Sequence, residues 1–175
     1  SLPAQATQLV TDYLYERYNP VDTPGAFYPT NNMVVPRDDF LKLGGFDERL
    51  RFGEDRDFCY RWHSQGRPFV FAPRAVVHHA HAFSCLTFVQ LHFCYGGGTC
   101  QFRNTCRGKG LARVRLSSPS WYLGLLLSGI RKEPCWRGAA LSLLLALSQM
   151  ASAAGLAWTG LKTVWERRDD GASQP

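Results

Sequence analysis

A long apolar segment towards the C-terminal end constrains this chain more than any other feature. No charged residue occurs from Gly138 to Leu161, and about 20 apolar residues are enough for a helix to cross a bilayer. Trp136 and Trp158 lie near the ends of the segment, and tryptophan collects at membrane–water boundaries. We predict a helix over 138–166 that either spans a membrane or lies on it. The alternative is a helix buried in a protein core.

Basic residues gather just before this segment. Lysines and arginines are frequent between residues 101 and 137, and the 175-residue chain carries a formal net charge of +6. The apolar stretch Trp121 to Ile130 lies among them and is too short to cross a bilayer. Basic residues beside apolar runs favour an anionic membrane surface over nucleic acid as the partner. We therefore predict a basic, membrane-proximal connector over 101–137 and a disordered polar tail over 167–175.

The first hundred residues alternate between helix-like and strand-like patterns. Phe58 and Trp62, four residues apart, share one face of a predicted helix. Asn19-Pro20 and Gly44-Gly45 are stop signals, and Gly96-Gly97-Gly98 is expected to end the last helix of this region. The apolar spacing predicts helices at 5–18, 36–44, 54–62 and 84–95, and short strands at 32–35, 68–71 and 75–77.

The loop Gly53-Glu54-Asp55 opens one of these helices. A helix N-terminus stabilises an ionised carboxylate, and a general base should be ionised at neutral pH and reach out from a loop. The competing interpretation is helix capping, because acidic residues are common in a first turn. Asp55-Arg56-Asp57 also has the form of a metal-binding Asp-x-Asp, but it begins a helix instead of ending a strand. We expect Asp57 to pair with Arg61 at four-residue spacing.

Two further groups could take part in binding. His78, His79 and His81 follow the last predicted strand, and imidazole is the commonest nitrogen ligand of divalent metal ions. Surface histidines are the alternative, and a small metal-binding protein that uses these histidines with Asp55 is a third. Asn32 either caps a turn or holds a substrate hydroxyl.

The order of these pieces resembles the second half of family 2 glycosyltransferases. The run TNNMVVPRDDFLKLGGFDERLRFGEDRDFCYRWHSQGRPFVFAPRAVVHHAH carries an Asn-containing strand and a helix that ends in Gly-Gly-Phe-Asp-Glu. A Gly-Glu-Asp loop then opens a helix with Arg-Trp, and a strand pair ends in His. The later FVQLHFCYGGG is similar to the family's helix with Gln and an aromatic-Gly end, although Cys94 stands where the family often has Arg.

The resemblance implies a GT-A fold, an α/β Rossmann-like domain with a mixed sheet between helices, over residues 1–100, with apolar C-terminal helices after it. It implies inverting transfer of a sugar from a nucleotide-diphosphate sugar to a hydroxyl of a glycan or lipid-linked acceptor. The expected setting is cell-envelope glycan or glycolipid synthesis at the cytoplasmic face of the membrane. No strand-ending Asp-x-Asp precedes Gln5, so we expect the chain to be the acceptor-side part of a longer protein. The alternative is a non-catalytic interaction module that retains the fold.

The resemblance also implies roles for single residues. Asp55 matches the family's catalytic base, which takes the proton of the acceptor hydroxyl. A divalent metal ion, Mg²⁺ or Mn²⁺, would neutralise the departing diphosphate, with His79 as the best match to the family's metal-side histidine and His78 and His81 as close alternatives. The acceptor side is expected to include Glu54, Asn32, Gly45, Arg61 and Trp62.

Overall fold

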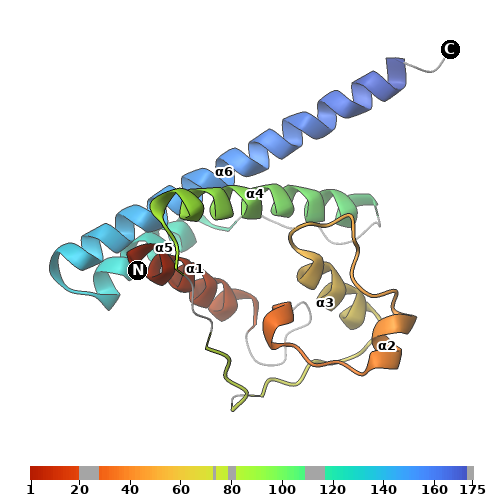
Figure 1. Cartoon of the computed structure of the whole chain (residues 1–175), viewed down its shortest axis with the longest axis horizontal. Helices are drawn as coiled ribbons and strands as arrows, with labels where there is room; N and C mark the ends of the chain where they lie inside the picture. The colour runs from red at the N-terminus through yellow and green to blue at the C-terminus, as the bar shows by residue number, and fades with distance from the viewer. Residues whose placement is uncertain (20–27, 73, 79–81, 109–116, 173–175) are drawn as a thin grey trace.

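The computed structural model describes residues 1–19, 28–72, 74–78, 82–108 and 117–172. All regular secondary structure within these ranges is helical (Figure 1). The elements in chain order are α1 (Leu2–Tyr18), the 3₁₀ turn η1 (Thr30–Asn32), α2 (Arg37–Lys42), α3 (Glu54–Ser64), α4 (Cys85–Gly108), α5 (Pro119–Lys132) and α6 (Cys135–Ala172).

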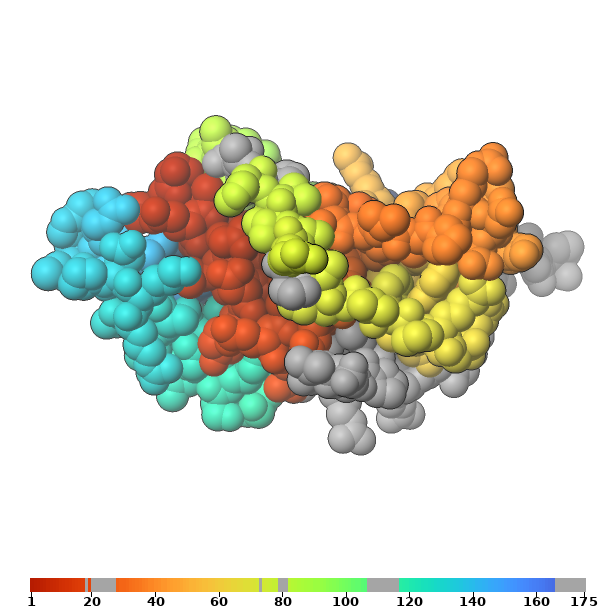
Figure 2. All heavy atoms as spheres, turned by 90° about the horizontal axis from the view of Figure 1, so that it is seen from below, coloured from red at the N-terminus to blue at the C-terminus, as the bar shows by residue number. Residues whose placement is uncertain are grey.

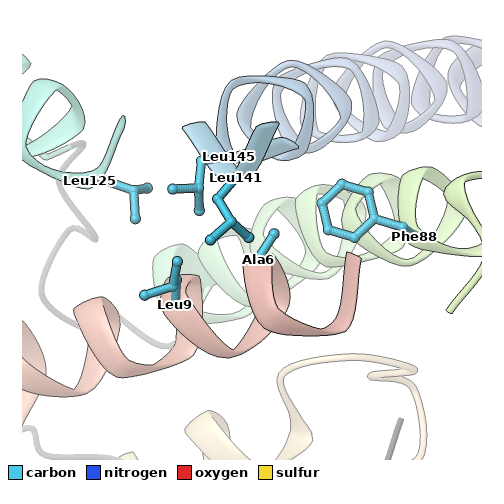
Figure 3. Packing of buried hydrophobic residues seen from close by; sticks show 6 residues of the cluster. All are labelled: Ala6, Leu9, Phe88, Leu125, Leu141 and Leu145. Atoms are coloured by element: carbon cyan, nitrogen blue, oxygen red, sulfur yellow. The ribbon is translucent and has the colours of Figure 1, made fainter. Parts of the chain in front are cut away.

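Three of these helices pack around α6 and form a four-helix bundle with it. α4 and α5 pack along α6, and α1 packs against α4, α5 and α6. Their shared core, seen from close by in Figure 3, consists of Ala6, Leu9, Phe88, Leu125, Leu141 and Leu145. Full burial of a side chain such as leucine or phenylalanine contributes about 1.5–3 kcal/mol, so this cluster is the main source of stability for the bundle.

Local signals in the sequence set the starts of the bundle helices. The Ser1 hydroxyl accepts a hydrogen bond from the Ala4 amide at 3.4 Å, and the Ser118 hydroxyl accepts one from the Trp121 amide at 3.3 Å. The Ser84 hydroxyl accepts one from the Thr87 amide at 3.1 Å, at the start of α4. Such caps satisfy amides that have no partner inside the helix. The predicted helices near 5–18, 36–44 and 54–62 are confirmed as α1, α2 and α3, and the apolar stretch Trp121 to Ile130 lies within α5.

A second, smaller cluster of side chains joins α2 to α3. The ring of Phe58 lies 5.3 Å from that of Phe40 and 5.8 Å from that of Trp62, measured between centroids. The predicted shared face of Phe58 and Trp62 is therefore confirmed. Figure 2 shows the molecule from below, with α1, α5 and the start of α6 on one side and the α2–α3 region on the other.

The expected α/β Rossmann-like fold is wrong for the described residues, which contain no strand. The segments predicted as strands, 32–35, 68–71 and 75–77, have no neighbouring strand to share backbone hydrogen bonds, and an isolated strand is not stable in water. The first and the third of these segments are joined by a side chain instead, because the Asn32 Nδ2 group donates to the Ala75 carbonyl at 3.0 Å. Several of their apolar side chains face solvent, with Val34 97% and Val70 88% exposed.

The predicted helix end at Gly96-Gly97-Gly98 is also wrong, because α4 continues to Gly108. Glycine weakens a helix by about 1 kcal/mol relative to alanine, but here the missing side chains let other backbones approach. A Cβ built on Gly96 would meet the Ser152 carbonyl of α6, and one built on Gly97 would lie 2.9 Å from the Thr159 hydroxyl. Close packing against α6 thus stabilises the glycine run as helix.

α6 begins earlier and ends later than predicted, and it continues through Ala172, over part of the expected tail. Its portion from Cys135 to Trp165 is long and apolar enough to cross a membrane, and 28% of its apolar window is buried inside the molecule. The core helix of a soluble protein would be mostly buried. The low burial therefore speaks against the core-helix alternative and weakly favours membrane association.

Candidate functional site

The loop Gly53-Glu54-Asp55 leads into the first turn of α3. Gly53 has a φ of +86°, a left-handed conformation that glycine adopts without strain. Its carbonyl accepts the first helical hydrogen bond, from the Asp57 amide at 3.0 Å. Glu54 and Asp55 follow as the first two residues of the helix, and both are partly buried. The backbone thus places two adjacent carboxylates in the first turn of a helix.

Asp55 is the more constrained of the two carboxylates. Its Oδ1 accepts a hydrogen bond from the Arg56 amide at 2.7 Å. Burial raises the pKa of the Asp55 carboxyl above its ordinary value, and the Arg56 amide and guanidinium oppose this only in part. A carboxylate with a raised pKa holds a proton more strongly than an exposed one does. Asp55 is therefore suited to accept a proton.

Two tyrosines from other helices lie within the electrostatic reach of Asp55. Burial raises the pKa of Tyr15 on α1 and of Tyr95 on α4, and the charge of Asp55 raises both further. The two phenols therefore stay protonated and able to donate hydrogen bonds. Neither tyrosine was singled out from the sequence, because each lies in an amphipathic helix far from residue 55 in the chain, and only the packing of α1 and α4 brings them here.

α4 holds the loop from the side. The rings of Phe52 and Tyr95 meet edge to face at 5.7 Å between centroids, and the Arg56 guanidinium carbon lies 5.9 Å from the centre of the Phe102 ring. A Cβ built on Gly98 would meet the Cβ of Phe52 and would lie 2.9 Å from its carbonyl oxygen. The glycine run thus makes room on one side for α6 and on the other for the loop that leads into Gly53-Glu54-Asp55.

The predicted pair of Asp57 and Arg61 is confirmed, with Arg61 Nε donating to the Asp57 carboxylate at 2.7 Å. The remaining guanidinium nitrogens donate to the Leu43 carbonyl at 2.8 Å and the Gly45 carbonyl at 2.7 Å. Arg61 therefore ties the end of α2 to α3. The Asp57 side chain is 1% exposed, and loss of its partner would leave a buried charge, which typically costs about 3–5 kcal/mol.

The other residues expected on the acceptor side are dispersed. Trp62 is buried and stacks on Phe69 with ring centroids 5.7 Å apart. Gly45 has a φ of +64° and its carbonyl is held by Arg61. Asn32 is exposed and contacts Ala75. The structure brings Glu54 and Asp55 together, while Arg61, Trp62 and Gly45 make internal contacts of the α2–α3 unit, so an acceptor role for those three stays a prediction.

The comparisons with known proteins bear on these features. The family model described as Glycosyl transferase family group 2 matches residues 14–164. The chain belongs to this family. The searches of curated proteins and of solved structures gave no match. The match runs from α1 through α6, so this family 2 glycosyltransferase carries both the Glu-Asp loop and the apolar helix inside its family region.

The metal site expected for the glycosyltransferase is not formed by the residues that the structure describes. His78 is exposed, and His79 and His81 lie outside the described residues. Among the described side chains, no group of three or more His, Cys, Asp or Glu residues comes together to hold a metal ion. The metal site and its predicted ligands therefore stay a prediction.

A groove in this glycosyltransferase lies away from Asp55, between α1 and α5. Its volume is about 300 Å³, and its lining combines two acids with two bases, Asp12, Glu16, Arg131 and Lys132. The Lys132 ammonium lies 4.0 Å from the Asp12 carboxylate across it. The charges balance one another, so the groove has no preference for an anionic or a cationic ligand.

Proposed function

We propose that this family 2 glycosyltransferase transfers a sugar, with inversion, from a nucleotide-diphosphate sugar to an acceptor hydroxyl, and that Asp55 is the general base. The supporting observation is the partly buried Asp55 carboxylate with a raised pKa at the N-terminus of α3. Inverting transfer needs a group that removes the acceptor proton as its oxygen attacks the anomeric carbon. Glu54, next to it, shapes the loop and contacts the acceptor.

The remaining parts of the proposal come from the family resemblance and the apolar helix. The acceptor is a glycan or a lipid-linked molecule of the cell envelope, and the protein works at the cytoplasmic face of the membrane. Exposed apolar side chains along α6 support membrane association. A divalent metal ion at the leaving diphosphate also belongs to the proposal, and it rests on the family resemblance alone.

Replacement of Asp55 by Asn tests the base directly. The full-length protein is reconstituted in membranes and assayed with a panel of UDP- and GDP-sugars and a membrane lipid extract as acceptor. We expect Asp55→Asn to lower kcat by about 10²–10⁴-fold, the range that general base catalysis supplies, with the KM for the donor little changed. Asp38→Asn, an exposed acid in the first turn of α2, is the matched control and should leave kcat unchanged.

Two outcomes would contradict the proposal. If Asp55→Asn retains near wild-type kcat, Asp55 is a capping residue and another group is the base. If the wild-type protein transfers no sugar from any donor of the panel, the non-catalytic interaction module is the better description of the chain.

A further inference from the structure

The groove between α1 and α5 has walls of opposite charge. α1 contributes two acids, Asp12 and Glu16, and α5 contributes two bases, Arg131 and Lys132. The groove has a volume of about 300 Å³, and its lining is completed by Leu9, Tyr13 and Ser128. A ligand that lies across the groove therefore meets a negative charge on one wall and a positive charge on the other.

One acid and one base of the groove are paired with each other. The Asp12 carboxylate accepts a hydrogen bond from Gln8 Nε2 at 2.7 Å and lies 4.0 Å from the Lys132 ammonium. Glu16 and Arg131 are exposed, and within the described part of the chain they form no ion pair or hydrogen bond. Charges that served only to join α1 to α5 would be expected to pair as Asp12 and Lys132 do. One carboxylate and one guanidinium therefore stay available to a ligand.

The shape of the groove is fixed by apolar contacts beneath it. Leu9 and Leu125 belong to the bundle core, and the rings of Tyr13 and Trp121 lie 5.2 Å apart. A Cβ built on Gly124 would meet the Tyr13 hydroxyl, so α5 approaches α1 closely at this point. The groove is therefore preformed, and neutral substitutions of its exposed charges should leave the bundle intact.

An apolar stripe on α5 leads to the groove. Leu123, Leu127 and Ile130 recur at i, i+4 and i+7 and are 58%, 36% and 55% exposed. Arg131 lies one turn beyond Leu127, between this stripe and the groove-lining Ser128. A molecule with an apolar chain can cover the stripe while its polar group reaches Arg131 and the groove. This combination favours a lipid over a free zwitterion.

We propose that the groove binds the headgroup of phosphatidylethanolamine, with the phosphate at Arg131, the primary ammonium at Glu16 and an acyl chain along the α5 stripe. The proposal rests on the membrane partner of the proposed function and names a lipid for it. A guanidinium can bind two phosphate oxygens at once. A primary ammonium offers three N–H donors to a carboxylate, whereas a choline headgroup has none and a glycerol headgroup has no positive charge.

Native mass spectrometry of the full-length protein in detergent, titrated with POPE, POPC or POPG, tests the site. We expect POPE to bind more tightly than the other two lipids. Glu16→Gln and Arg131→Gln should each weaken POPE binding roughly tenfold, the effect of losing one charge-assisted hydrogen bond. Arg37→Gln and Asp38→Asn remove exposed charges of α2 and, as matched controls, should leave POPE binding unchanged. Glu16→Gln should also reduce the preference for POPE over POPC, which a general loss of stability would not do.

Equal binding of the three lipids, or unchanged POPE binding in both groove variants, would overturn the proposal. Leu123→Ala should weaken binding of POPE, and soluble phosphoethanolamine should bind far more weakly than POPE. If phosphoethanolamine binds as tightly as the lipid, the ligand is a free zwitterion and the lipid assignment is wrong. No sugar donor is present in these measurements. A protein that transfers sugar but shows no preference for POPE would therefore refute this site alone, and loss of the Asp55-dependent activity would leave it untouched.

Discussion

The position of Asp55 in the first turn of α3 has two effects, a hydrogen bond to a free amide and a raised pKa of its carboxyl. As an acid in the first turn of α3 it satisfies the Arg56 amide at 2.7 Å, which is the capping behaviour expected from composition. Its partial burial beside Tyr15 and Tyr95 destabilises the ionised form and raises the pKa of its carboxyl. The ionised carboxylate is therefore held in an environment that favours proton uptake, and this should be visible in the stability of the protein.

The pH dependence of unfolding follows from this shift. Because the pKa of Asp55 is raised in the folded state, the folded protein binds the proton more tightly than the unfolded chain. Stability is therefore lost as the pH rises from the ordinary value of 3.8 through the raised folded value. Asp55→Asn removes this loss, so the variant should melt at a higher temperature than wild type at pH 7, and the difference should shrink towards pH 4.

The measurement is a thermal melt followed by circular dichroism at both pH values. For a chain of this size each kcal/mol corresponds to about 2–4 °C in Tm. Asp38→Asn again serves as the control and should show no such pH-dependent gain. A lower Tm for Asp55→Asn at pH 7 would mean that helix capping outweighs desolvation.

Single-residue patterns in the sequence predicted local contacts better than distant ones. The four-residue spacing of Asp57 and Arg61 was enough to predict their ion pair, because a helix alone sets that distance. The two carbonyls that Arg61 also binds, and the approach of Tyr15 and Tyr95 to Asp55, depend on how separate elements pack. No spacing rule contains that information.

At the level of elements, α4 shows why its three consecutive glycines led to a wrong prediction of a helix end. Three consecutive glycines normally end a helix, since each adds flexibility and no packing area. In α4 they are the positions where α6 and the Phe52 loop come closest, so the contacts outweigh the low helix propensity. The prediction of strands was wrong because it also ignored long-range packing. Extended segments form a sheet only beside other strands, and the local sequence does not show whether such strands are present.

Gly98→Ala tests the contact between α4 and the base-bearing loop. The added methyl group would meet Phe52, and overpacking of this kind typically costs about 1–3 kcal/mol. We expect kcat to fall at least about tenfold, because an ångström-scale displacement of a catalytic group can reduce the rate by roughly 10²-fold. Hydrogen exchange of the 50–58 segment should increase while the bundle helices keep their protection.

Gly160→Ala in α6 is the matched control for this variant. A Cβ at Gly160 would find only the Cys100 sulfur, at 3.8 Å, an ordinary contact. The substitution should leave kcat unchanged and leave stability equal or higher by up to about 1 kcal/mol. If Gly98→Ala behaves like Gly160→Ala, α4 does not position the loop.

At the scale of the whole molecule, the two sides of α6 differ in burial. Leu145 is fully buried in the bundle core, whereas Leu143 on the opposite side is 72% exposed. The same chemical change at these two positions should therefore affect different properties. The length of the charge-free segment and its flanking tryptophans predicted a membrane-spanning or membrane-associated helix, but they could not show which helices cover it.

Leu145→Ala should destabilise the bundle by about 2–5 kcal/mol, because it leaves a cavity in the core. Leu143→Ala should change the free energy of unfolding in detergent by less than about 0.5 kcal/mol, but should weaken binding to POPC/POPG vesicles roughly tenfold, since up to about 1.5–3 kcal/mol of leucine burial is at stake. Urea unfolding and vesicle flotation measure the two effects. Equal losses of stability would mean that both sides of α6 are covered by protein.

The position of α4 between α6 and the Phe52 loop has a mechanical consequence. α4 is one continuous helix with a glycine contact to each neighbour, so a displacement of α6 is passed to the loop without a hinge to absorb it. The surroundings of α6 would then influence the position of the Gly53-Glu54-Asp55 loop.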